Sequence, residues 1–223
     1  MSQYKFNLIK DDLFLLYINI AGTSIAIISA IFHLGWISAT IDITIVSTLY
    51  LIHILRRKDP LLTKMLVFGI SAGLAELFAD HWLVSIKQTL VYNPGGWFLW
   101  NSPVYMPFSW AGMLLSISCL GLYLVMRMPL WKASLLAAVV MGVYVPSYEA
   151  LANFANWWLY KNAPMLGSVP WFIILGEFLT ALPLTIIGIQ IFKRGVFFAA
   201  FSGALGGVWI WCAYAIAWRI TGS

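Results

Sequence analysis

Four carboxyl groups lie within stretches of sequence that are otherwise almost entirely apolar. Glu76 and Asp80 share one stretch and are four positions apart, and Glu149 and Glu177 lie in two others. Residues i and i+4 of a helix share one face, so Glu76 and Asp80 would lie one turn apart. Two carboxyls this close in a medium of low dielectric constant do not both ionise readily, so we expect one to be protonated at neutral pH. Such groups can donate and take back protons, and we predict that all four are catalytic.

Aromatic residues near these acids are the predicted substrate contacts. Protonation of an alkene creates a carbocation, and the faces of aromatic rings stabilise cations. We therefore expect a site whose carboxyls act on an apolar, unsaturated lipid that enters laterally. The residues assigned to substrate binding are His81, Tyr105, Trp110, Trp157 and Trp171.

The composition is that of a membrane protein. Hydrophobic residues make up 62% of the 223 positions and charged residues only 9%, whereas soluble domains carry about 25% charged residues. Seven apolar runs approach the length of about 20 residues that crosses a bilayer core. The sequence therefore predicts an all-α polytopic membrane protein with a single transmembrane domain over residues 1–223. The predicted spans are 13–32, 37–55, 65–86, 103–126, 133–154, 169–192 and 196–218.

Basic residues are distributed unevenly between the two sides of these spans. Ten of the 13 fall on one side, at Lys5, Lys10, Arg56, Arg57, Lys58, Lys64, Arg127, Lys132, Lys193 and Arg194. Only Lys87, Lys161 and Arg219 fall on the other side. The positive-inside rule then predicts a cytoplasmic N-terminus and an external C-terminus, in a membrane of the bacterial cytoplasmic type. The net charge of +5 favours anionic headgroups rather than nucleic acid as a partner.

This orientation places Glu76 near the middle of its span and Asp80, Glu149 and Glu177 in the outer halves of theirs. Asp42 lies at a similar depth in the second span. An ionisable residue inside a span is costly and by default indicates function. Asp42 lies close enough to the end of its span that solvation alone would also explain it.

The two connections on the acid-bearing side are rich in Trp and Tyr. They read VYNPGGWFLWN between spans 3 and 4, and NFANWWLYKNAPMLGS between spans 5 and 6. Such residues are typical of the aromatic belt at a membrane interface; alternatively, these connections fold over a cavity as lids or short interfacial helices. The blocks PVYMPFSW and PWFIILGE follow them at similar spacing. Spans 3–4 and 5–6 are therefore predicted to be related helical hairpins with a site between them.

Several other chemistries are not indicated. The three His form no HxxxH or HxxHH box, and no CxxC or HExxH motif predicts a metal site. No glycine-rich phosphate loop, dinucleotide fingerprint or DDxxD cluster is present, so we expect neither a bound nucleotide nor prenyl transfer. Cys119 and Cys212 lie in apolar runs, which favours packed thiols over a disulfide. We predict no cofactor and no bound metal.

The order of these features resembles that of a known enzyme family. An acid-bearing span, an aromatic loop and SPVYMPFSW, followed by WWLY and GSVPWFIILGE, is similar to membrane-embedded carotenoid hydratases of the bisanhydrobacterioruberin hydratase type. More loosely, it resembles the integral-membrane lycopene and terpene cyclases. The resemblance covers about residues 70–180. It implies terpenoid or carotenoid biosynthesis by a lyase, cyclase or isomerase with Glu76, Asp80 and Glu149 as acid–base residues. The pocket would be shaped by Pro103, Pro107, Trp110, Pro170 and Trp171.

Two other classes of function stay open beside an isoprenoid-converting enzyme. Carboxyls inside spans also occur in proton-coupled transporters and lipid-handling proteins. A structural or assembly subunit would instead pair them with basic residues of a partner. Small residues in the last span allow close helix packing, within the chain or between protomers of a homo-oligomer. These residues are Gly203, Ala204, Gly206 and Gly207.

Overall fold

A computed structural model describes residues 2–222, with side chains described from residue 13 onward. Within this part of the chain, seven helical segments are long and apolar enough to cross a membrane. The predicted all-α class and the predicted number of spans are thereby confirmed. The spans are formed by α1 (Ser2–Phe32), α2 (Trp36–Arg57), α3 (Pro60–His81) with the π-helical turn η1 (Trp82–Ile86), α4 (Met106–Val125), α5 (Leu130–Phe154), α6 (Trp171–Ala181) with α7 (Leu184–Lys193), and α8 (Val196–Thr221).

The sixth span, predicted as one run at 169–192, consists of two helices. α6 ends at Ala181 and α7 begins at Leu184, directly after Pro183. Proline has no amide hydrogen to bond to the preceding turn, and its ring clashes with that turn. The helix is therefore interrupted about midway through the span. Pro146 also lies inside a helix, but α5 continues past it to Phe154.

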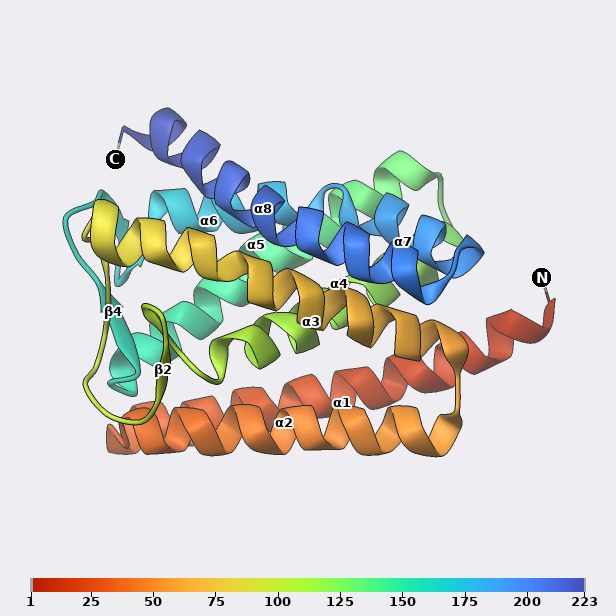
Figure 1. The fold of residues 1–223 in the computed structure, drawn as a ribbon, viewed down its shortest axis with the longest axis horizontal. Coiled ribbons are helices and arrows are strands. Elements are labelled where there is room, and N and C mark those ends of the chain that lie inside the picture. The colour runs from red at the N-terminus through yellow and green to blue at the C-terminus, as the bar shows by residue number, and fades with distance from the viewer. Residues whose placement is uncertain (1, 223) are drawn as a thin grey trace.

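The two ends of the helix bundle differ (Figure 1). One end carries the short strands and the C-terminus, and the N-terminus lies at the opposite end. α1 and α2 pack against each other along one side, while α3 packs against α4 and α8. The side chains of Lys5 and Lys10, which entered the count of basic residues, lie outside the described residues.

The aromatic connections fold as short antiparallel strand pairs, which the sequence did not predict. β1 (Leu90–Tyr92) pairs with β4 (Trp158–Tyr160), so that these two distant loops are joined through their backbones. The other pairs are local hairpins, β2 (Phe98–Leu99) with β3 (Ser102–Pro103) and β5 (Met165–Leu166) with β6 (Val169–Pro170). The predicted alternative of short interfacial helices is therefore wrong for these segments.

The two hairpins have the same layout. In each, two residues separate the strands, and the first of them has a positive φ, 59° at Trp100 and 62° at Gly167. In each, the second strand ends in a proline, Pro103 or Pro170, shortly before α4 or α6 begins. A left-handed conformation is easy for glycine but costs about 1–2 kcal/mol for a residue with a side chain. The tryptophan at position 100 is thus held in its turn by its surroundings.

Glycines allow α3 to lie in direct contact with its neighbours. A Cβ on Gly73 would lie 2.9 Å from the Cα of Pro107 in α4, and a Cβ on Gly207 of α8 would lie 2.5 Å from the Cβ of Ala75. Real Cβ atoms do not approach other atoms so closely, so both contacts require glycine. α3 is thereby held between α4 and α8, and its residue Glu76 is only 1% exposed.

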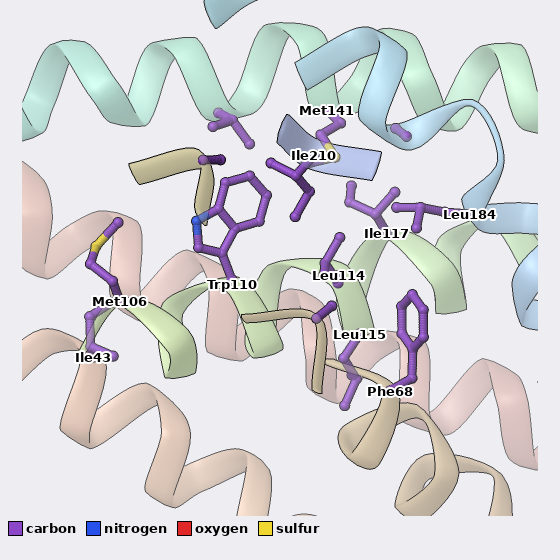
Figure 2. Close-up of a cluster of buried hydrophobic side chains, with 14 of the residues drawn as sticks. Ile43, Phe68, Met106, Trp110, Leu114, Leu115, Ile117, Met141, Leu184 and Ile210 are labelled. Carbon is purple, nitrogen blue, oxygen red and sulfur yellow. The ribbon is translucent and has the colours of Figure 1, made fainter. Parts of the chain in front are cut away.

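The apolar core lies next to these acid-bearing segments (Figure 2). Its side chains come from all eight α-helices, α1 to α8, and include Ile43, Phe68, Leu114, Leu115, Ile117, Met141, Leu184 and Ile210. Met106 and Trp110 belong to the same cluster, and in Figure 2 the indole of Trp110 lies between Met106 and Ile210. Met106 and Trp110 also line the cavity described below, so Trp110 borders the core and the cavity at once.

Candidate functional site

One cavity near the strand-bearing end of the bundle brings together all four predicted catalytic residues. It offers about 90 Å³ to the centres of water-sized molecules, whereas a single water needs about 10–15 Å³. Glu76 and Asp80 of α3, Glu149 of α5 and Glu177 of α6 all line it. The fold therefore collects acids from three spans around a space large enough for several waters.

Asp80 accepts two hydroxyl hydrogen bonds from the strands. Its Oδ2 accepts from the Tyr92 hydroxyl at 2.6 Å and from the Ser102 hydroxyl at 2.5 Å. Tyr92 belongs to β1 and Ser102 to β3, so both donors come from the loop that follows α3. The loop thus fixes the direction of the carboxyl on the helix that precedes it.

Glu76 lies one turn before Asp80 on the same helix. Its carboxyl interacts with that of Asp80 and with the indole of Trp110. The Oε2 atom is buried and has no hydrogen-bond partner among the described residues. Burying a polar atom without a partner is unfavourable, so this oxygen is placed to bind a molecule inside the cavity.

Glu149 and Glu177 each accept a hydrogen bond from an aromatic residue. The indole of Trp158 donates to Oε2 of Glu149 at 2.5 Å, and the Tyr214 hydroxyl donates to Oε1 of Glu177 at 2.5 Å. The second oxygen of Glu177, Oε2, is buried without a partner in the described structure. Aromatic donors therefore hold one oxygen of each acid and leave the Glu177 carboxyl free to bind on its other side.

The cavity contains acids without a basic side chain to balance them. No Lys or Arg is found among its described lining residues. Carboxyls that are buried together repel one another when charged, and burial itself disfavours charge. Protons shared among the acids are the remaining way to balance the site, and that is the arrangement needed for proton donation and return.

The two tyrosines of the strand pair β1–β4 keep their protons at physiological pH. Burial raises the pKa of the Tyr92 phenol well above its usual value of 10.0, and the nearby Asp80 carboxylate raises it further. Burial and the nearby Glu149 carboxylate raise the pKa of Tyr160 in the same way. Both hydroxyls therefore act as hydrogen-bond donors toward the acids.

The strand pair β1–β4 covers the cavity with alternate residues. Leu90 and Tyr92 of β1 and Trp158 and Tyr160 of β4 line the cavity, whereas Val91 and Leu159 between them do not. Successive side chains of a strand point to opposite faces. The aromatic connections are thus placed as lids, one of the two alternatives that the sequence left open.

The cavity also reaches the side of the bundle between α2 and α4. Phe108 of α4 lines it and is 49% exposed, and the half-buried residues Val46 and Ser47 of α2 line it from the opposite side. All three lie within apolar spans. The exposed part of the cavity lining at this position faces the region that lipid chains would occupy.

The predicted substrate contacts are only partly brought to the cavity. Trp110 lines it, but His81, Tyr105, Trp157 and Trp171 are not among its lining residues. His81 stacks on Trp100 with 4.1 Å between ring centroids and bonds through Nδ1 to Asn101 Oδ1 at 2.6 Å.

The remaining three lie behind or outside the cavity wall. Trp157 is 1% exposed and donates its indole N–H to the Ser38 hydroxyl at 2.8 Å. Tyr105 is buried directly before α4, and Trp171 is 44% exposed at the start of α6. These positions are compatible with a supporting role for Trp157 and Tyr105, while Trp171 faces the surroundings of the bundle.

The sequence left Asp42 open between function and solvation, and it did not identify several other cavity residues. Asp42 lines the cavity and its Oδ2 accepts a hydrogen bond from Tyr148 at 2.7 Å. The aromatic donors to the other acids were missed because nothing in the sequence pairs a given tyrosine with a given carboxyl. They are Tyr92, Trp158, Tyr160 and Tyr214. The Tyr and Trp enrichment of the loops was the available signal for the first three.

The acids are not arranged as a metal site. Across the described residues, no group of three or more His, Cys, Asp or Glu is placed to hold a metal ion. Cys119 and Cys212 are not joined in a disulfide.

Comparison with known proteins gives a family without an assigned activity. No curated protein and no solved structure matches the chain. A family model does match residues 77–221, which is more than half of the chain and includes Asp80, Glu149 and Glu177. The chain therefore belongs to the family described as a domain of unknown function, DUF6989.

Proposed function

We propose that the protein is a cofactor-independent membrane enzyme that protonates an alkene of an apolar isoprenoid lipid. The observation that carries this proposal is the single cavity in which Glu76, Asp80, Glu149 and Glu177 meet. Four carboxyls without a basic partner are costly to bury. They are useful where protons must be given and taken in a water-poor space.

The hydrogen bonds suggest how the roles are divided. Asp80 accepts two hydroxyl donors, which stabilise a carboxylate. Glu76 beside it has an unpartnered oxygen and is the proposed proton donor. The proton from Glu76 adds to one alkene carbon, the π electrons form the new C–H bond, and the neighbouring carbon becomes cationic. A carboxylate, Asp80 or Glu149, then removes a proton.

The fate of the cation determines the product class. Loss of a proton from an adjacent carbon gives a shifted double bond. Attack by a second alkene of the same chain, followed by proton loss, gives a ring. Attack by water, followed by proton loss from oxygen, gives an alcohol. Each outcome returns one proton to the acids and requires no oxidant or reductant. All three agree with the activities implied by the resemblance to carotenoid hydratases and terpene cyclases.

Two features of the cavity support an isoprenoid substrate. The rings of Tyr92, Trp110 and Trp158 line it and offer faces that stabilise a cation. The proposed entrance lies beside the exposed Phe108, within its span, where a lipid chain can enter without crossing water. Membrane lipid or a dissolved isoprenoid is therefore the proposed small-molecule partner.

Deuterium incorporation tests the protonation step directly. The protein in lipid vesicles made in ²H₂O is supplied with acyclic isoprenoid polyenes, and carbon-bound deuterium is measured by mass spectrometry. The wild type should introduce deuterium, while Glu76→Gln and Asp80→Asn should lower the rate at least a hundredfold, since general acid–base groups contribute about 10²–10⁴-fold. Asp59→Asn is the matched control, because Asp59 caps α3 away from the cavity and Asn also caps helices.

Two results would count against the enzyme. Deuterium incorporation by both variants at the wild-type rate would show that these acids do not transfer the proton. If the wild type labels none of the polyenes, the proposed protonation of an alkene is refuted.

A proton-coupled transporter is the second candidate, and polar residues deeper in the bundle favour it. Asn19 of α1 and Tyr50 of α2 line the same cavity. Each lies in the half of its span that is farther from the strand-bearing end of the bundle. The Tyr50 hydroxyl is 2.7 Å from that of Ser116, and the Asn19 amide donates to the Ser116 hydroxyl at 3.1 Å. Proton-driven solute flux in sealed vesicles, lost in Tyr50→Phe and without deuterium labelling, would support transport over catalysis.

We also propose the orientation that the basic residues predict, with the N-terminus in the cytoplasm and the strand-bearing end outside, in a cytoplasmic membrane of the bacterial type. In a variant lacking Cys119 and Cys212, a membrane-impermeant thiol reagent added outside should label Lys161→Cys and spare Arg194→Cys. The reverse pattern would invert the topology.

The common layout of the two hairpins supports a repeat of spans 3–4 and 5–6. Gly203 and Gly207 pack against α3 within the chain, so a homo-oligomer would form through other residues.

A further inference from the structure

A fifth acid lines the same cavity, between α1, α2 and α5. Asp42 of α2 is 0% exposed and lines the cavity. Its Oδ2 accepts a hydrogen bond from the Tyr148 hydroxyl at 2.7 Å. Its Oδ1 has no hydrogen-bond partner in the part of the chain that the structure describes. One oxygen of the Asp42 carboxyl is therefore hydrogen-bonded, and Oδ1 is left to bind another group.

A glycine keeps space open next to that free oxygen. A Cβ on Gly22 of α1 would lie 3.4 Å from Asp42 Oδ1 and 3.0 Å from a methyl of Val46. Gly22 lines the same cavity. The methyl group of a Gly22→Ala variant would therefore occupy the space beside Asp42 Oδ1. It would remove no hydrogen-bonding group of the protein.

A second polar pair lies close along the same helices. The Thr23 and Tyr144 hydroxyls are 2.9 Å apart, and both residues line the cavity. Tyr144 precedes Tyr148 by one turn of α5, and Thr23 follows Gly22 in α1. Hydroxyl groups thus continue the polar surface that begins at Asp42.

The same helices line the cavity with the apolar Ile18, Ile43, Val46 and Val145 and with the polar Asn19, Ser47 and Tyr50. Asn19 and Tyr50 already form hydrogen bonds with Ser116. A polar group carried on a mostly apolar molecule therefore fits beside Asp42 Oδ1. A hydroxyl group can both donate and accept a hydrogen bond, so it suits the carboxyl whether or not Asp42 carries a proton.

We propose that Asp42 and the Gly22 space form a binding site for the hydroxyl group of an isoprenoid alcohol. The apolar chain then extends along the cavity toward Glu76 and Asp80. The isoprenoid nature of the chain rests on the proposed function, whereas the hydroxyl site rests on the geometry around Asp42. This assigns oxygen-bearing isoprenoids, rather than pure hydrocarbons, as the preferred ligands.

The affinities of two related probes test the site independently of product formation. Farnesol and farnesene have the same branched skeleton, but farnesene lacks the hydroxyl and has one more double bond, and quenching of tryptophan fluorescence in lipid nanodiscs measures their affinities. The wild type should bind farnesol about tenfold more tightly, as expected for one hydrogen bond to a carboxylate. Gly22→Ala should abolish this preference and leave farnesene binding unchanged.

Two further variants complete the test. Gly206→Ala is the matched control, because its Cβ would meet the Phe68 ring at an ordinary 3.4 Å and lies away from the cavity lining. Asp42→Leu should also abolish the preference, and retained farnesene binding shows that its cavity is intact.

Equal affinities for the two probes in the wild type, no binding of either probe, or a preference that survives in Gly22→Ala would overturn the site. Deuterium labelling of a hydrocarbon polyene does not depend on Asp42, so either proposal can fail without the other.

Discussion

The hydrogen bond between Tyr214 and Glu177 offers the cleanest measure of how strongly the cavity depends on its aromatic donors. Both residues are buried, at 4% and 1% exposure, and the hydroxyl lies 2.5 Å from Oε1. Tyr214→Phe removes only this hydroxyl, since the ring keeps its edge contact with Phe172 at 6.4 Å. Glu177 would then have two unpartnered oxygens, because Oε2 already lacks a partner in the described structure.

The expected cost follows from that geometry. Interhelical hydrogen bonds in membranes contribute about 0.6 kcal/mol on average and up to about 1.7 kcal/mol, and bonds to charged groups contribute about 1.5–3 kcal/mol. A short, buried bond to a carboxyl belongs near the upper end of the membrane range, so Tyr214→Phe should destabilise the fold by about 1.5 kcal/mol.

A double-mutant cycle isolates this bond. In a Glu177→Leu background the Tyr214→Phe change should cost less than about 0.5 kcal/mol, because no acceptor remains. Unfolding in mixed lipid–detergent micelles, followed by circular dichroism, gives the free energies. Tyr17→Phe is the matched control at a position that is 65% exposed. Equal losses in the two backgrounds would refute the assigned bond, since they would show that the hydroxyl acts independently of the carboxyl.

Two further predictions concern packing and pH. Gly207→Ala should destabilise the protein by at least about 2 kcal/mol, because the new methyl would lie 2.5 Å from Ala75 Cβ; the adjacent Gly206→Ala should cost less than about 0.5 kcal/mol, and equal thermal stability of the two variants would contradict the close contact of α3 and α8. The raised pKa of Tyr92 means that the unfolded chain releases this proton first, from about pH 10. The stability due to this proton is thus complete below about pH 10 and falls above it, so Tyr92→Phe should lose less thermal stability than the wild type between about pH 9 and pH 11.

The sequence was informative about the acids because an ionisable residue in an apolar run is conspicuous wherever its helix lies. Glu76, Asp80, Glu149 and Glu177 were selected on that basis and meet in one cavity. The spans were predictable for a similar reason, since twenty apolar residues leave the backbone few alternatives to a helix in lipid.

Side-chain direction was harder to predict than position along the chain. His81 follows Asp80 directly, but neighbours on a helix are rotated by about 100° from each other, and His81 stacks on Trp100 instead. Similarly, Trp157 bonds to Ser38 while its neighbour Trp158 bonds to Glu149. The pairing of β1 with β4 joins segments that are far apart in sequence, and such pairing depends on how the helices pack.

The alternation along β1 and β4 separates two tasks in the cover of the cavity. Backbone hydrogen bonds join the strands, and these do not depend on which side chains are present. The side chains at the inward positions determine the shape of the cavity wall that the strands form. These residues are Leu90, Tyr92, Trp158 and Tyr160. Tyr92 and Trp158 also hold Asp80 and Glu149 by hydrogen bonds, whereas Leu90 has no polar side-chain atom. Related sequences can therefore exchange Leu90 and acquire new ligand selectivity while the helices, the acids and the strand register stay as they are. Directed evolution of this cavity would best begin there.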